Sequence, residues 1–208
     1  MEKEIYEISD LSGESLDRAI EAIKENPKFH NRDVDLDWLV DSLQEDLKEN
    51  GFDSAEISFS GFWSQGDGAS FVGKVDDKEK FFETIGISVS EIHPRVWEFI
   101  EENLDMSIVR HSSRYVHEGT VSVDWEFYDD PVVQMFPSSL EFGDITINVE
   151  EFLASEGLWS KGTAWKNSKC KEIYRTIEKA YEEEFSDEAA IDWADQMGIE
   201  FDEKGNEI

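Results

Sequence analysis

The stretch FSGFWSQGDGASF, Phe59–Phe71, places three glycines and an aspartate inside a run of aromatic residues. Before these glycines, Ile57 and Phe59 alternate with polar residues, and after them Phe71 and Val75 resume the same period of two. Two alternating segments around a short connection of glycine and aspartate are typical of a β-hairpin. The stretch therefore predicts a glycine-rich hairpin in an antiparallel sheet.

The connection between the two alternating segments has two interpretations, one structural and one functional. Gly66 and Gly68 supply positive φ in the tight connection, where Asp67 caps backbone N–H groups. In the functional interpretation, Ser64, Gln65 and Asp67 form a binding or catalytic loop that a rigid scaffold displays.

Two further glycines, Gly61 and Gly73, fall on the core side of the alternating segments. Glycine in a strand often marks a place where another group approaches the backbone closely. We expect these positions to leave room for a large ring, with Trp63 or Trp125 as the candidates.

A partial phosphate-loop pattern overlaps the hairpin. The segment Gly68–Lys74 fits the first seven positions of GxxxxGK, but Val75 stands where a Mg²⁺-binding hydroxyl is needed. The residues after Lys74 are a poor helix start, and the phosphate loop must lead into a helix. The pattern therefore predicts strand rather than nucleotide binding.

The rest of the chain is predicted to form mainly helices, which come before and after the strands in the sequence. Before the hairpin we expect a short strand in EIYEIS, a helix capped by Ser9 or Ser12 and ended by Pro27, and a helix from Leu36 to Gly51. After it we expect a polar turn at 76–80, a helix after Pro94, and strands at 106–111, 115–127 and 142–149. The chain then ends in helices at 165–185 and 186–197. This order predicts one α+β domain over residues 1–208, an antiparallel sheet with a central glycine-rich hairpin, covered by N- and C-terminal helices.

Charge is the strongest functional signal. The chain has 50 Asp and Glu against 19 Lys and Arg, a formal net charge of −31. Such a charge opposes direct binding of nucleic acid and of anionic membranes and favours a basic target protein. It equals the phosphates of about 15 base pairs of B-DNA, which permits DNA mimicry if the acids share one face. The acids predicted to bind the target are Glu182, Glu183, Glu184, Asp187 and Glu188. The alternative for this run of acids is that it is simply a solvated surface.

Other features predict a reducing, cytoplasmic setting. No apolar run approaches the ~20 residues of a transmembrane helix, the N-terminal MEKEIYEISD lacks the features of a secretory signal, and one cysteine cannot form an internal disulfide. The lysines around Cys170 favour a lowered thiol pKa, although no obvious base accompanies it. No cofactor and no metal are predicted, and the oligomeric state is left open.

The alternative function is a metal-dependent or acid–base hydrolase. His111 and His117 fall in one strand region, and Asp67 lies in the hairpin connection. Imidazoles with carboxylates can bind a divalent metal or transfer protons. In a regular strand His117 shares a face with Val121 and points into the core, unless Gly119 hosts a bulge.

Several segments of the chain resemble one protein family. The hairpin stretch, together with SDLSGESLDRAI, HSSRYVHEGTVSVDWEF and IYRTIEKAYEEEFSDEAA, is similar to bacterial and phage proteins often labelled antitoxin of a toxin–antitoxin stability system. Ser113 and Val116 depart from the glycine and tyrosine of that pattern. The resemblance implies a bacterial or phage setting and a role in blocking another protein, and it implies no catalytic residues.

Overall fold

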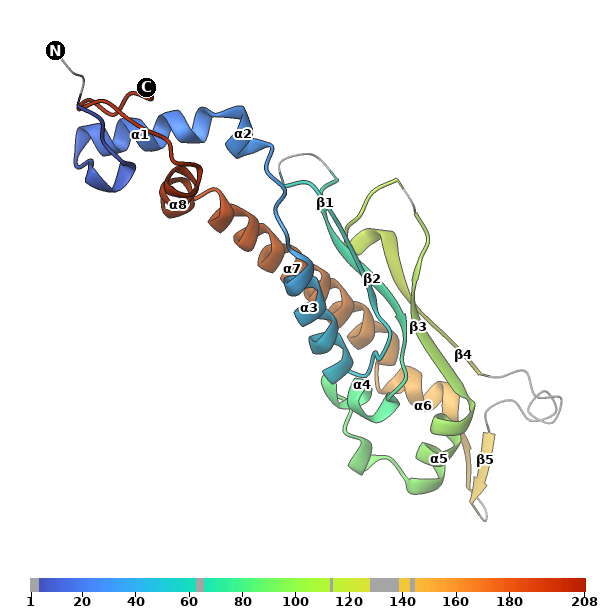
Figure 1. Cartoon of the computed structure of the whole chain (residues 1–208). Helices are drawn as coiled ribbons and strands as arrows, with labels where there is room; N and C mark the ends of the chain where they lie inside the picture. Colours follow the sequence, from blue (N-terminus) through green and yellow to red (C-terminus); the bar gives the residue numbers. More distant parts are fainter. Residues whose placement is uncertain (1–3, 63–65, 113, 128–138, 143–144) are drawn as a thin grey trace. The chain divides into compact units, whose positions relative to one another are not determined.

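The computed structural model describes residues 4–62, 66–112, 114–127, 139–142 and 145–208. The chain divides into two compact units (Figure 1). Unit 1 combines Met1–Leu36 with Ile177–Ile208, and unit 2 is Asp37–Thr176. No helix in the described part of the chain is both long and apolar enough to cross a bilayer.

Unit 2 is built on a four-stranded antiparallel sheet with the order β1-β2-β3-β4. Its strands are β1 (Glu56–Ser60), β2 (Gly68–Lys74), β3 (Leu104–Arg110) and β4 (Val121–Phe127). β1 and β2 form the predicted hairpin, in which Ile57 pairs with Phe71 and Ser60 with Gly68. The α+β class and the glycine-rich hairpin are therefore confirmed.

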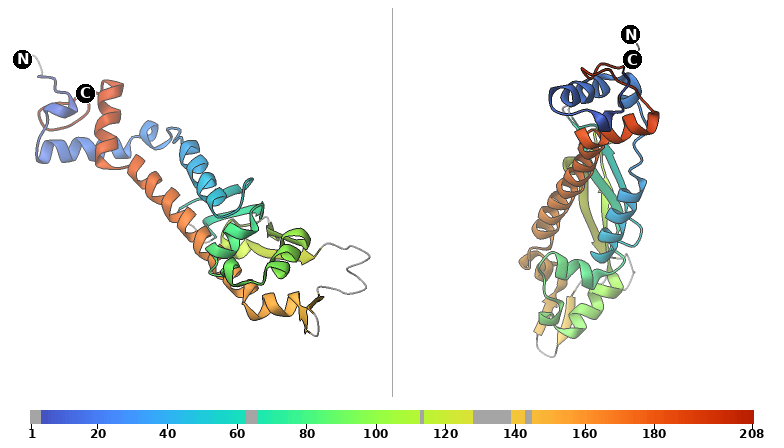
Figure 2. Two further views of the ribbon diagram at one scale, coloured as in Figure 1. Left: turned by 90° about the horizontal axis from the view of Figure 1, so that it is seen from below. Right: turned by 60° about the vertical axis from the view of Figure 1, so that its left-hand side comes forward.

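Helices precede, interrupt and follow this sheet (Figures 1 and 2). Those of unit 2 are α3 (Asp37–Glu49), α4 (Lys78–Thr84), α5 (Pro94–Asn103), α6 (Val149–Ser155) and most of α7 (Leu158–Glu184), with short 3₁₀ turns η2 (Val89–Glu91) and η3 (Glu118–Thr120). A separate hairpin consists of β5 (Ser139–Phe142) and β6 (Ile145–Asn148), so the single strand expected at 142–149 is wrong, and Val149 begins α6. The turn predicted at 76–80 is wrong in its second half, because the Asp77 carboxylate accepts a hydrogen bond from Lys80 N and starts α4.

An aromatic cluster joins α7 to the sheet. The Trp165 ring stacks on Phe52 at 5.7 Å between centroids and meets Phe71 and Phe81 edge to face at 5.9 and 5.4 Å. A Cβ built on Gly73 would lie 3.5 Å from the Phe52 ring. That distance is an ordinary contact, whereas Ala55 Cα would lie only 3.2 Å from the added Cβ. Gly73 therefore accommodates the Ala55 backbone and not a large ring, for which the sequence suggested Trp63, which lies outside the described residues, or Trp125.

Unit 1 contains η1 (Ile8–Asp10), α1 (Glu14–Glu25), α2 (Pro27–His30), the last turns of α7 and α8 (Asp187–Met197). Its core lies between α1 and α8 and holds Ile8, Leu11, Ala19, Ile23, Phe29, Ala190, Ala194 and Phe201. The strand expected in EIYEIS is reduced to one bridge, in which Tyr6 pairs with Phe201. Gly13, rather than Ser9 or Ser12, precedes α1.

Candidate functional site

The five predicted binding acids lie where α7 ends and α8 begins, and we call them the junction acids: Glu182, Glu183, Glu184, Asp187 and Glu188. All five side chains are exposed. The Ser186 hydroxyl accepts a hydrogen bond from Ala189 N at 3.2 Å and caps α8. Because acids in a first helical turn interact favourably with the helix dipole, the cap explains locally why Asp187 and Glu188 follow it.

Three of the junction acids form ion pairs within unit 1. Arg32 lies 3.4 Å from Glu184, Lys24 pairs with Asp187, and Lys179 lies 3.5 Å from Glu183. Among the described residues, Glu182 and Glu188 form no ion pair. The junction therefore keeps an excess of negative charge.

Aromatic contacts fix the position of the junction. The Arg32 guanidinium lies over the rings of Phe29 and Phe185, 4.0 and 4.6 Å from their centroids. Phe29 also meets Trp193 of α8 edge to face at 5.4 Å. Since a guanidinium between two rings loses little freedom when it binds a carboxylate, Glu184 is held by a rigid partner.

Unit 1 is the more densely charged part of the chain. Met1–Leu36 and Ile177–Ile208 contain 22 Asp and Glu against 7 Lys and Arg, a formal charge of −15. Unit 2 contains the remaining 28 acids and 12 bases, a charge of −16 on about twice as many residues. Unit 1, which carries the junction acids, therefore has about twice the negative charge per residue of unit 2.

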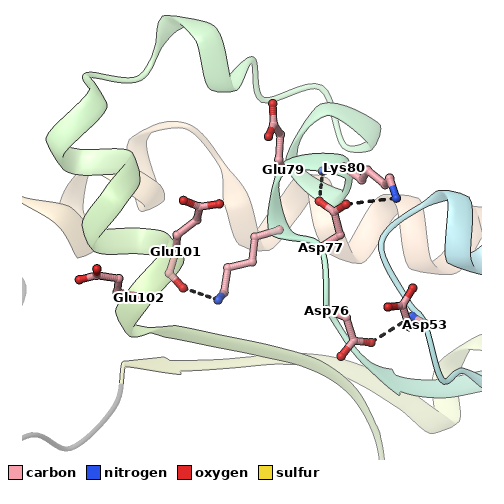
Figure 3. Close-up of a pocket in the computed structure, with 8 residues that line it drawn as sticks. Asp53, Asp76, Asp77, Glu79, Lys80, Glu101 and Glu102 are labelled. Carbon is pink, nitrogen blue, oxygen red and sulfur yellow. Dashed lines mark hydrogen bonds and ion pairs between the residues drawn. The ribbon is translucent and has the colours of Figure 1, made fainter.

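Unit 2 has a second acidic surface, an open cleft of about 650 Å³ beside the start of α4 (Figure 3). Its lining residues are Asp53, Asp76, Asp77, Lys78, Glu79, Lys80, Glu101 and Glu102. Several of these groups already have structural partners: Lys78 Nζ donates to the Glu101 carbonyl oxygen at 2.7 Å, and the Asp76 carboxylate accepts from Asp53 N at 3.0 Å. Burial lowers the pKa of Lys78.

The tip of the glycine hairpin is only partly described. Ser64 and Gln65 lie outside the described residues, and Asp67 is half-buried. Gly61 follows β1 with φ +49°, and a Cβ built there would lie 2.5 Å from the Asp67 carboxylate. Gly66 has φ +103°, and a Cβ built there would likewise come too close to its neighbour, the Tyr115 ring. The glycines therefore allow the connection to fold closely on itself and on Tyr115. Two expectations are wrong: Gly61 does not lie within a paired strand but follows β1, and Gly68 does not supply positive φ but begins β2.

The two histidines of the alternative function have local contacts. His117 is half-buried and precedes η3, and its Nδ1 accepts a hydrogen bond from Gly119 N at 3.0 Å. His111 is exposed, and its backbone N donates to the Thr120 carbonyl oxygen at 3.1 Å. β4 begins only at Val121, so the strand expected over 115–127 is wrong in its first part, and the condition under which His117 would point into the core is not met. Within the described ranges, no three or more His, Cys, Asp or Glu side chains form a group that could hold a metal ion.

Two buried lysines of α7 form polar contacts that the sequence did not indicate. Lys166 Nζ donates to the carbonyl oxygens of Glu118 and Val121 at 2.6 and 2.9 Å, and burial lowers its pKa. Burial also lowers the pKa of Lys169, but hydrogen bonds to Asp46 and Glu172 outweigh it and leave the pKa raised. Their positions on the buried face that carries Gly162 and Ile173 are the one signal that could have revealed them.

Cys170 lies on the same buried face, with 1% of its surface exposed. Burial raises the pKa of its thiol to about 11. The lowered pKa expected from the neighbouring lysines is therefore wrong, because desolvation of the thiolate outweighs the attraction of Lys166. Cys170 is a packing residue.

A family model described as a domain of unknown function, DUF8835, matches residues 31–187. The match spans unit 2 and the junction as far as Asp187. Neither the curated proteins nor the solved structures include a match to this chain.

Proposed function

Given that the chain belongs to the family described as domain of unknown function DUF8835, we propose that it acts by binding and occluding a basic target protein. The acidic surface of unit 1 would cover a cationic, nucleic-acid-binding region of the target. The observation that carries this proposal is the charge of −15 on unit 1, together with the exposure of all five junction acids.

The position of the acids supports such a contact. They lie on helix ends fixed by Ser186 and by Arg32, so few backbone conformations are lost when a partner binds. A dense negative field also accelerates encounter with a cationic surface and disfavours anionic competitors.

The internal ion pairs do not oppose this role. Exposed ion pairs contribute only about 0–1 kcal/mol each, so a partner lysine or arginine can displace Lys24 or Lys179 at little cost. Glu182 and Glu188, which have no ion-pair partner among the described residues, are the first contacts we expect.

The same class of function is what the sequence resemblance to proteins labelled as antitoxins implies, and we include it in the proposal. An antitoxin-like protein of a bacterium or phage would neutralise a toxic host or phage protein in the cytoplasm. If that target binds nucleic acid, the acidic surface would compete with phosphates for its Lys and Arg residues.

The test starts from partners captured at low ionic strength from bacterial lysate on the immobilised chain, each then purified. Calorimetry measures their affinity at low salt and at 1 M salt, where the Debye length falls to about 3 Å. We expect basic partners whose affinity falls at least about tenfold with salt.

Matched variants locate the contact. Replacing Glu182 and Glu188 together by glutamine should slow association severalfold, whereas the same change at Glu91 and Glu98, exposed acids of unit 2, should not. Acidic partners, or affinities equal at both salt concentrations, would overturn the proposed function.

A further inference from the structure

Unit 1 contains a groove of about 670 Å³ between its N-terminal segment and the C-terminal end of α8. The groove is lined by Ile5, Glu7, Asp10, Ala194, Asp195, Gly198, Ile199 and Glu200. None of these lining residues is basic. The groove is separate from the junction acids, which lie at the other end of α8.

The backbone explains why these residues meet. Gly198, with φ +62°, ends α8, and Ile199 N donates to the Ala194 carbonyl oxygen at 3.0 Å. The chain then turns back, and Phe201 pairs with Tyr6 through N–H···O bonds of 2.9 and 3.0 Å. Phe201 is buried and Tyr6 is half-buried against the same core. Because neighbours of a paired residue point to the opposite side, Ile5, Glu7 and Glu200 are directed into the groove.

The groove combines exposed apolar surface with an acidic rim. Ile5 is 58% exposed, and Ile199 is half-buried beside it. The four acids that line the groove form no ion pair within the described residues, although Glu7 and Asp10 exchange hydrogen bonds with each other's backbone. Acidic side chains beside two isoleucines are complementary to an apolar side chain flanked by cations.

We propose that this groove binds a basic segment of the target protein, in which an apolar side chain contacts Ile5 and Ile199 and neighbouring lysines or arginines face the acidic rim. The inference rests on the proposed function and adds to it a second contact and a sequence preference. An apolar anchor gives the specificity that charge alone lacks, because exposed charges contribute little to binding once salt screens them.

The spacing along α8 defines the segment further. Asp187, a junction acid, and Asp195, at the groove, are eight residues apart and therefore about 12 Å apart along the helix axis. About four extended residues span that distance. One continuous basic segment can therefore reach both the junction acids and the groove.

The test uses short fluorescent peptides. A lysine-rich peptide with one central leucine is compared with the same peptide carrying serine instead, by fluorescence anisotropy on the full chain. We expect the leucine peptide to bind about tenfold more tightly at moderate salt. Ile5→Ser should remove that preference, and Glu200→Gln should weaken binding of the leucine peptide about twofold to fivefold. Ile208→Ser is the control, since Ile208 is 55% exposed in the same unit but does not line the groove.

The outcomes separate the two proposals. Equal binding of the leucine and serine peptides, or a preference that Ile5→Ser leaves intact, overturns the groove, whereas salt-dependent binding of both peptides still sustains the proposed function. Binding of a glutamate-rich peptide with the same leucine as tightly as the lysine-rich one also overturns the groove. Absence of binding to either lysine-rich peptide at low salt contradicts both proposals.

Discussion

Gly68→Ala tests why the hairpin needs glycine. A Cβ built on Gly68 would lie 2.7 Å from both the Val116 carbonyl oxygen and the His117 Cβ, about 1 Å inside normal contact. The neighbouring segment cannot move away easily, because Lys166 holds the next turn by its carbonyl oxygens. We therefore expect a loss of about 2 kcal/mol in the free energy of unfolding, within the usual cost of overpacking.

Thermal unfolding followed by circular dichroism is a suitable assay, and this loss should lower Tm by about 4–8 °C in a chain of this size. Gly162→Ala is the matched control. Gly162 lies inside α7, and its added Cβ would meet Val123 and Phe81 at 3.7–3.8 Å, an ordinary contact distance. Alanine also favours a helix, so this variant should gain about 1 kcal/mol. If Gly68→Ala were as stable as the unmodified chain, close contact would not be the reason for glycine at that position.

Three further predictions concern the side chains of Lys166, Asp77 and Cys170. Lys166→Met removes the Lys166 donor from the buried Val121 carbonyl oxygen and the part-buried Glu118 carbonyl oxygen. It should cost about 2–4 kcal/mol in urea denaturation, whereas a loss under 1 kcal/mol would contradict the dependence of these oxygens on Lys166. The backbone hydrogen bond from Lys80 lowers the pKa of Asp77 below its ordinary 3.8, so the carboxylate stabilises the fold above that pH and the stabilisation is lost as pH falls through the folded-state pKa. The stability difference between the unmodified chain and Asp77→Ala, about 1 kcal/mol near neutrality, should therefore shrink in acid, and a constant difference would exclude this linkage. Because the pKa of Cys170 is about 11, its thiol should resist alkylation at pH 8 until urea is added; rapid labelling of the folded chain would show that the thiol is not buried.

The elements with a clear period were predictable from sequence. Alternation on both sides of the glycines predicts β1 and β2, and Ser186 and Gly198 mark both ends of α8. The helix α4 was missed because KEKFFET is short and highly charged, and its two phenylalanines lack helical spacing. Its formation depends on burial of Phe81 and Phe82, which only the tertiary structure supplies.

The candidate site was predictable to a similar extent. The sequence identifies the junction acids and their exposure, because a run of charges is usually solvated. It does not reveal that Arg32 reaches Glu184, a contact between residues 152 positions apart. The groove was missed for the same reason, since it forms only when Phe201 pairs with Tyr6.

The buried ammonium of Lys166 also has a practical consequence for chemical footprinting. An amine whose donors are held by main-chain oxygens, with 3% of the residue exposed, is shielded from acylating reagents. Acylation followed by mass spectrometry would therefore modify lysines at the surface first, and the appearance of modified Lys166 would report how often unit 2 opens.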